Sequence, residues 1–360
     1  MQYFGIDCGR DSIKAICYKE GEFEKFNFSS KFVDGYDLGM LENISILNFN
    51  IKEHIIARIN DEELRIYGKF CNKLPPELTQ LVISDDRYIK YSLDFILVAI
   101  AELMDYDDEV IVGLNLTANN INYKKEIKDY FLGKTFNVKL YNNIGKVVKD
   151  INIKFKEVGV WFQGWTSYLN YAINDNFDVE LDYVKQDVLL IDIGRATLDC
   201  VYISELSNVK TMAFNYGMEV LYNRMIDLLY NKYNVKKSTI EISNILLNNK
   251  KIYDKNGKEI DINEILEDRV NKIGNEMYNV IYNNFSNYSY DKVYLTGGGS
   301  FYFDKKLKEM FSNLEVIEDP VFSNAKGLIK MIVRKFLKGK KGQNFEDKKE
   351  IVINQGSIFD

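Results

Sequence analysis

Runs and alternations of apolar residues divide the chain into stretches that predict both strands and helices. The stretches 1–9, 11–21 and 22–30 are separated by glycine-containing turns, which predicts three consecutive strands. Residues 86–105 carry apolar side chains at helical spacing, and the strongly apolar stretch 108–116 after them predicts a buried strand. This succession of strands and helices predicts an α/β protein.

The same patterns continue to the end of the chain and contain a repeat. A second strand–turn–strand at 187–204 has the form of residues 1–18: an apolar strand, aspartate, one residue, glycine, a short polar turn and an outgoing strand. The repeat predicts two related halves. The other predicted elements are helices at 122–133, 164–175 and 324–337, mainly helix over 217–285, strands at 137–143 and 146–163, and a strand with three glycines at 291–303.

Length and charge narrow the class of protein. A chain of 360 residues exceeds the size at which one hydrophobic core stops growing, so two domains are expected. Lys and Arg total 47 against 53 Asp and Glu, a net charge of −6 that disfavours direct binding to nucleic acid. The N-terminus lacks the features of a signal peptide, and no window reaches the roughly 20 apolar residues of a spanning helix. We therefore expect a cytoplasmic protein with no membrane partner.

The cysteines and the histidine give no sign of a metal centre. The four cysteines form no Cys-x-x-Cys pair, and His54 is the only histidine, so a conventional zinc site is not expected. We expect Cys8, Cys17, Cys71 and Cys200 to be reduced residues of strands.

Two Asp-x-Gly turns carry the clearest chemical signal. Asp7 and Gly9 end the first predicted strand, and Asp192 and Gly194 end the strand within LLIDIGRATLDCVYI. Glycine lets backbone amides approach phosphate oxygens, and a carboxylate exposed at the tip of a strand can hold hydrated Mg²⁺. A single such turn is a common hairpin feature, but two in matching positions predict a clamp on a polyphosphate. Lys14 is either within reach of the phosphates or a solvated strand lysine, and the sequence leaves both open.

A run of three glycines gives the third signal. Gly297, Gly298 and Gly299 follow an apolar strand, which allows close approach of a ligand, and Ser300 and Tyr302 would border a base or ribose. The pattern is not G-x-G-x-x-G, and no acidic residue follows at the required distance, so a dinucleotide-binding fold is not supported. A flexible glycine turn is the alternative.

In this order and spacing, GIDCGRDSIKA, LLIDIGRATLD and LTGGGS resemble the two phosphate loops and the adenosine loop of the actin, heat-shock chaperone and sugar kinase ATPase superfamily. The resemblance extends from residue 1 to about residue 335 and is greatest to the bacterial and archaeal actin-like family typified by the plasmid-partition actin ParM. It implies two duplicated α/β domains around a nucleotide cleft. The implied boundaries are 1–185 for domain I, with a smaller insertion within about 30–90; 186–335 for domain II, with a helical insertion within about 217–285 and the adenosine loop at 295–302; and 336–360 for a C-terminal tail that could be mobile.

The resemblance also implies roles for individual residues. Asp7 and Asp192 would organise Mg²⁺ through water, and Gln163 falls where the family keeps a residue that positions the attacking water. Contacts to ATP, or to GTP, are implied for Gly9, Arg10, Ser12 and Lys14 in the first loop, for Gly194, Arg195, Ala196, Thr197 and Asp199 in the second, and for Gly217, Gly297, Gly298, Gly299 and Tyr302 around the nucleoside.

Some positions depart from the family pattern. Asn115 stands where proline is usual, Trp165 and Thr166 stand near a usual Gly-Ala pair, and Arg195 occupies a site often held by a small residue. These departures leave the loop geometry and the choice between ATP and GTP open.

The function implied by the resemblance is an ATP hydrolase that self-associates with nucleotide into dynamic filaments and serves plasmid DNA segregation. DNA would be contacted only through a DNA-binding adaptor protein. The alternative is a small-molecule kinase of the same superfamily, which needs a carboxylate base near the substrate hydroxyl. Gln163 argues for water as the acceptor, whereas Glu157 keeps the kinase open. Cell-shape and division actins also remain open.

Overall fold

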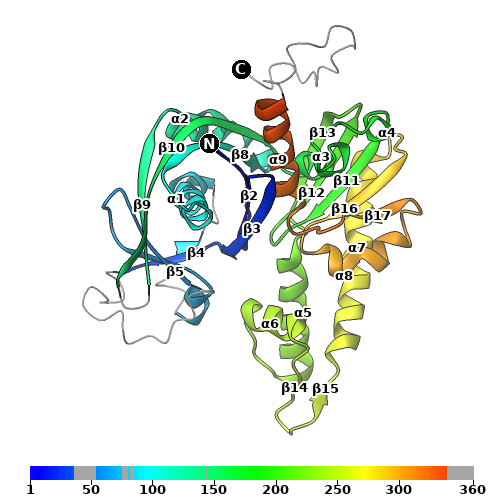
Figure 1. Cartoon of the computed structure of the whole chain (residues 1–360). Helices are drawn as coiled ribbons and strands as arrows, with labels where there is room; N and C mark the ends of the chain where they lie inside the picture. The colour runs from blue at the N-terminus through cyan, green and yellow to red at the C-terminus, as the bar shows by residue number, and fades with distance from the viewer. Residues whose placement is uncertain (36–53, 75–79, 82–84, 143–144, 339–360) are drawn as a thin grey trace. The chain divides into compact units, whose positions relative to one another are not determined.

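The computed structural model describes residues 1–35, 54–74, 80–81, 85–142 and 145–338, which form two compact units (Figure 1). The first unit contains residues 1–185 together with residues 321–338 from the far end of the described chain. The second unit contains residues 186–320. Each unit is built on a sheet of its own, with ten strands in the first and five in the second.

The sheet of the first unit has the strand order β3-β2-β1-β8-β10-β9-β5-β6-β4-β7. Strands β1, β8 and β10 are parallel, and the other neighbouring pairs are antiparallel. The carboxyl ends of the three parallel strands therefore share one edge of the sheet. The strands are β1 (Gln2–Cys8), β2 (Ser12–Lys19), β3 (Glu22–Ser29), β4 (Lys31–Asp34), β5 (His54–Ile59), β6 (Arg65–Gly68), β7 (Gln80–Leu81), β8 (Asp108–Leu116), β9 (Thr135–Tyr141) and β10 (Val147–Phe162).

Helices cover both faces of this sheet. Phe4 and Ile6 of β1 belong to the same buried cluster as the apolar residues of α1, such as Phe95. Gly5 lies between them in β1 and contacts α9, so α9 packs on the opposite face, because neighbouring residues of a strand point to opposite sides. The helices are η3 (Lys69–Lys73), α1 (Asp85–Leu103), η5 (Ala118–Tyr123), α2 (Lys124–Phe131), α3 (Trp165–Ala172), α4 (Leu181–Val184), α9 (Ser323–Val333) and η6 (Arg334–Lys338).

A row of glycines runs across the three parallel strands. Gly5 of β1 is the register partner of Gly113 of β8, which is the partner of Gly159 of β10. A Cβ at Gly5 would lie 2.3 Å from the carbonyl oxygen of Ala325, and one at Gly113 would lie 2.2 Å from Cδ1 of Ile332. At Gly159 it would lie 1.9 Å from Cη2 of Trp161 on the same strand. The row is thus a flat strip that lets α9 and the indole ring of Trp161 approach the sheet closely.

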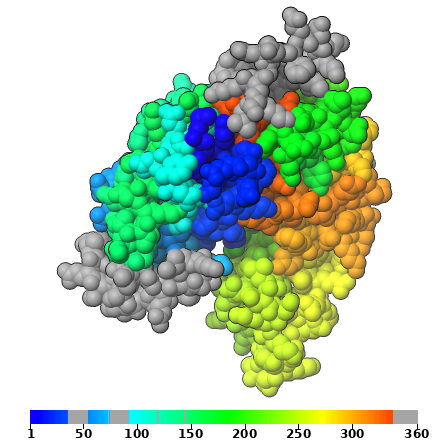
Figure 2. Space-filling model, viewed as in Figure 1, coloured from blue at the N-terminus to red at the C-terminus, as the bar shows by residue number. Residues whose placement is uncertain are grey.

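The second unit is a mixed five-stranded sheet of order β13-β12-β11-β16-β17, with helices packed on it. A capping box at Ser238 begins α6, and the side chain of Asp261 accepts hydrogen bonds from the first turn of α7. In Figure 2 the segment from α6 to β15 forms a narrow projection of this unit. The elements are β11 (Val188–Ile193), β12 (Leu198–Ser204), β13 (Ser207–Phe214), α5 (Met218–Tyr233), α6 (Thr239–Leu247), β14 (Ile252–Tyr253), β15 (Glu259–Ile260), α7 (Ile262–Phe285), β16 (Lys292–Thr296), α8 (Ser300–Lys308) and β17 (Leu314–Val316).

The predicted α/β class is confirmed, and so are the strand–turn–strand repeat and most of the long elements. Cys71 is an exception to the predicted strand cysteines, because it lies in η3. The segment 291–303 is a strand only as far as Thr296, and Ser300 already begins a helix. Residues 321–335 pack with the first unit, although the sequence placed them with the second half, because α9 docks on β1, β8 and α3.

Some sequence expectations lie wholly or partly outside the described residues. The insertion expected at about 30–90 is described only in part, and residues 339–360 of the expected tail are not described. Within the ranges that the structure describes, no helix is long and apolar enough to cross a membrane.

Candidate functional site

The first Asp-x-Gly hairpin joins β1 to β2. Asp7 and Lys14 are register partners, and Lys14 Nζ lies 3.4 Å from Asp7 Oδ2. The turn is closed by a hydrogen bond of 3.2 Å from the amide of Gly9 to the carbonyl oxygen of Ser12. A Cβ at Gly9 would lie 2.7 Å from Lys14 Nζ, so glycine leaves room for the ammonium group over the turn. Arg10 is exposed at the tip.

The second hairpin repeats this turn between β11 and β12. The amide of Gly194 donates to the carbonyl oxygen of Thr197 over 2.9 Å, just as Gly9 donates to Ser12. The register partner of Asp192 is Asp199, whose Oδ2 accepts a hydrogen bond of 2.7 Å from the hydroxyl of Thr197. The backbone geometry is therefore the same in both hairpins, while an aspartate stands in the second where Lys14 stands in the first.

Helix α5 begins directly on the second hairpin. The carbonyl oxygens of the turn accept hydrogen bonds from the first amides of the helix: Gly217 to Ala196 (3.2 Å), Met218 to Gly194 (3.0 Å) and Glu219 to Arg195 (2.8 Å). A Cβ at Gly217 would lie 2.4 Å from the carbonyl oxygen of Arg195. Gly217 thus allows the helix to pack against the turn, which fixes the conformation of the turn.

The three glycines lie against the carboxylate of Asp192. Gly297 has a φ of +82°, and a Cβ there would lie 2.3 Å from Asp192 Oδ1. The amide of Gly299 donates to the carbonyl oxygen of Ile193 over 2.9 Å, which joins the glycine loop to the second hairpin. Ser300 is fully buried, and its hydroxyl donates to the carbonyl oxygen of Gly297 over 2.8 Å. The hydroxyl of Ser300, which was expected to border a base or ribose, is thus directed at the loop itself and holds the loop in shape.

The two aspartates are buried, which corrects the expectation of exposed carboxylates at the strand tips. Asp7 is 3% exposed and Asp192 is 2% exposed. For Asp192 the cause is the glycine loop, whose backbone lies directly against the carboxylate. Sequence patterning could not predict this burial, because the loop is more than a hundred residues further along the chain.

Gln163 lies at the same sheet edge as Asp7. It follows the last residue of β10, and its amide donates to the carbonyl oxygen of Leu116, the last residue of β8, over 2.8 Å. Since β1, β8 and β10 are parallel neighbours, Asp7 and Gln163 are two strand spacings apart, or about 10 Å. The amide of Gly164 then donates to Asn324 Oδ1 of α9 over 3.0 Å, which fixes the chain after Gln163.

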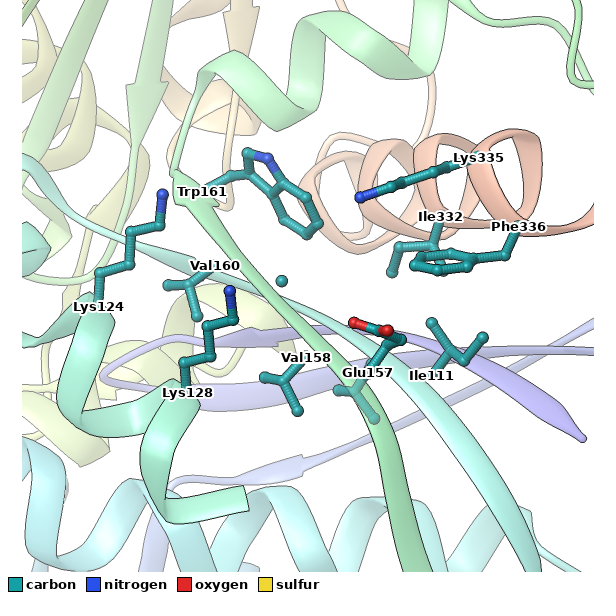
Figure 3. A pocket seen from close by; sticks show the side chains of 12 residues that line it. Ile111, Lys124, Lys128, Glu157, Val158, Val160, Trp161, Ile332, Lys335 and Phe336 are labelled. Carbon is teal, nitrogen blue, oxygen red and sulfur yellow. The ribbon is translucent and has the colours of Figure 1, made fainter. Parts of the chain in front are cut away.

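Glu157 lies elsewhere in the first unit. Figure 3 shows it pointing from the middle of β10 into a pocket, with Lys124 and Lys128 of α2 on one side and Lys335 of η6 on the other. Six residues of strand separate Glu157 from Gln163, which corresponds to about 20 Å. None of the residues predicted to bind nucleotide lines this pocket. Glu157 therefore does not place a carboxylate base beside Asp7.

The cysteines near the hairpins are unsuited to nucleophilic chemistry. All four are free thiols. Burial raises the pKa of the Cys8 thiol well above its usual value, and the neighbouring carboxylate of Asp7 raises it further. Burial, Asp199 and Asp192 raise the pKa of Cys200 in the same way. A thiol with so high a pKa stays protonated near neutral pH. Within the described ranges, no three His, Cys, Asp or Glu side chains gather into a metal site.

Two α/β units, each with an Asp-x-Gly hairpin at the end of its first strand, define the actin fold, and comparison with solved structures shows that this chain has it. The resemblance to ParM and other actin homologues is thereby confirmed at the level of structure. A family model described as archaeal actin homologue MreB-like, C-terminal, matches residues 190–309. No curated protein sequence matches the chain significantly.

Solved actin homologues align with nearly the whole chain. The archaeal actin homologue Ta0583 is similar with a TM-score of 0.75 and 16% identity, over 93% of this chain and 100% of that chain. ParM from a 15-stranded filament of Clostridium botulinum has a TM-score of 0.69 and 22% identity, over 92% and 98% of the two chains. The pSK41 ParM protein has a TM-score of 0.67 and 20% identity, over 94% and 98%.

Proposed function

We propose that this chain is an ATPase that binds ATP with Mg²⁺, polymerises into filaments and destabilises them by hydrolysis. The observation that carries the proposal is the contact between the Asp192 carboxylate and the glycine loop at Gly297, beside a hairpin whose turn geometry recurs at Asp7. Relatives of the same fold support it: Ta0583 has been crystallised with ADP, and a Bacillus thuringiensis ParM with AMPPNP.

The chemistry of the residues fits a magnesium nucleotide. Asp7 and Asp192 are anionic ligands of the kind that hold hydrated Mg²⁺ beside a polyphosphate, and the metal would neutralise charge on the phosphates. Lys14 lies next to Asp7 and would exchange that partner for a phosphate oxygen. The remaining proposed nucleotide contacts are Gly9, Arg10 and Ser12 of the first hairpin, Gly194, Arg195, Ala196 and Thr197 of the second with Asp199 supporting it, and Gly217, Gly297, Gly298, Gly299 and Tyr302 around the nucleoside.

Gln163 is the proposed water-positioning residue. Enzymes accelerate phosphoryl transfer mainly by positioning the reacting groups and by neutralising the charge on the phosphates. A neutral side-chain amide can orient the attacking water without acting as a strong base. The edge that Gln163 shares with Asp7 supports this role. We expect Gln163→Ala to slow phosphate release while retaining nucleotide binding.

The second part of the proposal is that the filaments serve plasmid segregation. The filament of the Clostridium botulinum ParM supports self-association of a chain with this fold. The net charge of −6 is unfavourable for direct contact with DNA, so the DNA would be bound through an adaptor protein. Direct binding of this chain to DNA at physiological salt would contradict the proposed need for an adaptor protein.

Polymerisation and hydrolysis can be measured in one tube. Light scattering, pelleting and phosphate release would be recorded for the purified chain with Mg²⁺ and ATP, GTP or ADP. We expect nucleotide-dependent pelleting that decays as phosphate accumulates, and loss of turnover in Asp192→Ala. Asp304→Ala on α8 is a matched control that removes a surface carboxylate. The alternative is a small-molecule kinase. It would be supported if light scattering stayed flat at high protein concentration and ATP were consumed only after a small metabolite was added.

A further inference from the structure

The side chain of Arg195 extends from the second hairpin onto the helices α5 and α6. Its guanidinium carbon lies 5.3 Å from the centre of the Tyr222 ring, a cation–π distance. Its Nη2 lies 3.5 Å from the hydroxyl of Thr239, the first residue of α6. The guanidinium is therefore held on an aromatic face, although its backbone belongs to the turn proposed to bind phosphate.

The Tyr222 ring, which we call the aromatic platform, is fixed in place. Tyr222 is 6% exposed and belongs to the core of the second unit. It lies one helical turn after Met218, whose amide is hydrogen-bonded to the hairpin, so ring and hairpin are parts of one rigid arrangement. Arg195 itself is only partly buried.

The platform extends toward the residues proposed to bind the nucleoside. Tyr302, in the first turn of α8, follows the glycine loop directly and packs against the same core as Tyr222. Burial raises the pKa of Tyr302, in keeping with its packing against that core. Arg195 thus lies on Tyr222 itself, and Tyr302 packs against the core to which Tyr222 belongs.

We propose that Arg195 binds the purine base by stacking, with its guanidinium plane between the base and the Tyr222 ring, and does not bind the phosphates. This inference rests on the proposed function, since it assumes that a nucleotide occupies the site. An arginine guanidinium is planar, weakly hydrated and stacks on aromatic faces, which a lysine ammonium cannot do. Stacking contacts the face of the base, which adenine and guanine share, so Arg195 contributes equally to binding of ATP and GTP.

The test compares ligands with and without a base. Competition against a fluorescent ATP analogue would give the affinities of wild type, Arg195→Ala and Arg195→Lys for MgATP, MgGTP and inorganic tripolyphosphate. We expect Arg195→Ala to weaken ATP and GTP roughly tenfold each and to leave tripolyphosphate unchanged. We expect Arg195→Lys to be as weak as Arg195→Ala, and Tyr222→Phe, which keeps the aromatic face, to bind like wild type.

Different outcomes separate this inference from the proposed function. If wild type binds no nucleotide, the proposed function fails and the inference fails with it. If wild type binds ATP but Arg195→Lys restores the affinity, or tripolyphosphate weakens in parallel with ATP, Arg195 is a phosphate ligand and only the inference is overturned. Unchanged nucleotide binding in Arg195→Ala also overturns it.

Discussion

Asp192 and Asp199 are direct cross-strand neighbours in the β11–β12 hairpin, and each is only 2% exposed. The equivalent pair in the first hairpin is Asp7 and Lys14, which form an ion pair. The first hairpin therefore pairs a carboxylate with an ammonium group, whereas the second places two carboxylates side by side. Under the proposed function, this asymmetry makes the second hairpin the one that gains more from a bound Mg²⁺.

Asp192→Asn should separate catalysis from stability. We expect MgATP turnover to fall at least about 100-fold, because the charge facing the proposed Mg²⁺ is lost. The free energy of unfolding should stay the same or rise, because one of two adjacent buried negative charges is removed. Phosphate release and urea denaturation measure the two effects. Asp304→Asn on α8 is the control, since it neutralises a surface carboxylate outside both hairpins. Full turnover in Asp192→Asn would contradict the assigned role.

Gly297→Ala and Gly298→Ala form a matched pair. At Gly297 the new methyl group would meet Asp192 Oδ1 at 2.3 Å and the carbonyl oxygen of Ile193 at 2.5 Å, on a backbone with a φ of +82°. We expect the melting temperature to fall and the free energy of unfolding to drop by about 1–3 kcal/mol. At Gly298 nothing lies within 4 Å of the new atom, so stability should change by less than about 0.5 kcal/mol. Equal destabilisation by both substitutions would contradict the close contact of Gly297 with Asp192 and Ile193.

The glycine row predicts a rescue between two distant residues. A methyl group at Gly113 would meet Cδ1 of Ile332 at 2.2 Å, so Gly113→Ala should destabilise the chain by about 1–3 kcal/mol through overpacking. Ile332→Val removes that carbon atom. We expect the double variant to lose less free energy of unfolding than the two single variants lose together, as measured by urea denaturation. Gly5→Ala should not be rescued by Ile332→Val, because its methyl group would meet the backbone of Ala325. Strict additivity for Gly113 and Ile332 would count against this contact.

Asp175 should contribute stability that depends on pH. Buried Lys330 donates to the carbonyl oxygens of Asn170 (2.9 Å) and Ile173 (2.8 Å), and its Nζ lies 2.8 Å from Asp175 Oδ1. The hydrogen bond from Lys330 lowers the pKa of Asp175. A lowered folded-state pKa means that the contribution is present above about pH 4 and is lost as the pH falls through the folded value.

We therefore expect Asp175→Asn to cost less than about 1 kcal/mol near neutral pH, since Asp175 is largely exposed. The difference from wild type should vanish in acid. Denaturant titrations across the pH range measure it, and in a Lys330→Met background the effect of the substitution should shrink to the weaker contribution of Lys326, whose Nζ lies 4.0 Å from Asp175 Oδ1. A difference that persists unchanged in acid would mean that the ion pair is not its source.

The sequence was sufficient wherever the signal is local. Each Asp-x-Gly turn and the run from Gly297 to Gly299 can be located from a few consecutive residues, and their strands follow from apolar patterning. What sequence reasoning missed depends on contacts between distant segments. The burial of Asp192 results from the glycine loop, and the stacking of Arg195 depends on α5.

The glycine row is an intermediate case. Gly5, Gly113 and Gly159 each interrupt an apolar stretch that was predicted as a strand, which is an unusual position for glycine. That signal was present in the sequence. Only the register of the three strands shows that the glycines are aligned, and only α9 explains why.

The position of α9 also has a consequence for the order in which the protein matures during translation. Its binding strip on β1 and β8 is made early, but the helix itself begins only at Ser323. A nascent chain folds from its N-terminus as it leaves the ribosome. The first unit therefore waits, with the strip uncovered, until the entire second unit has been synthesised, and a chain that stops before Ser323 leaves the strip without its helix.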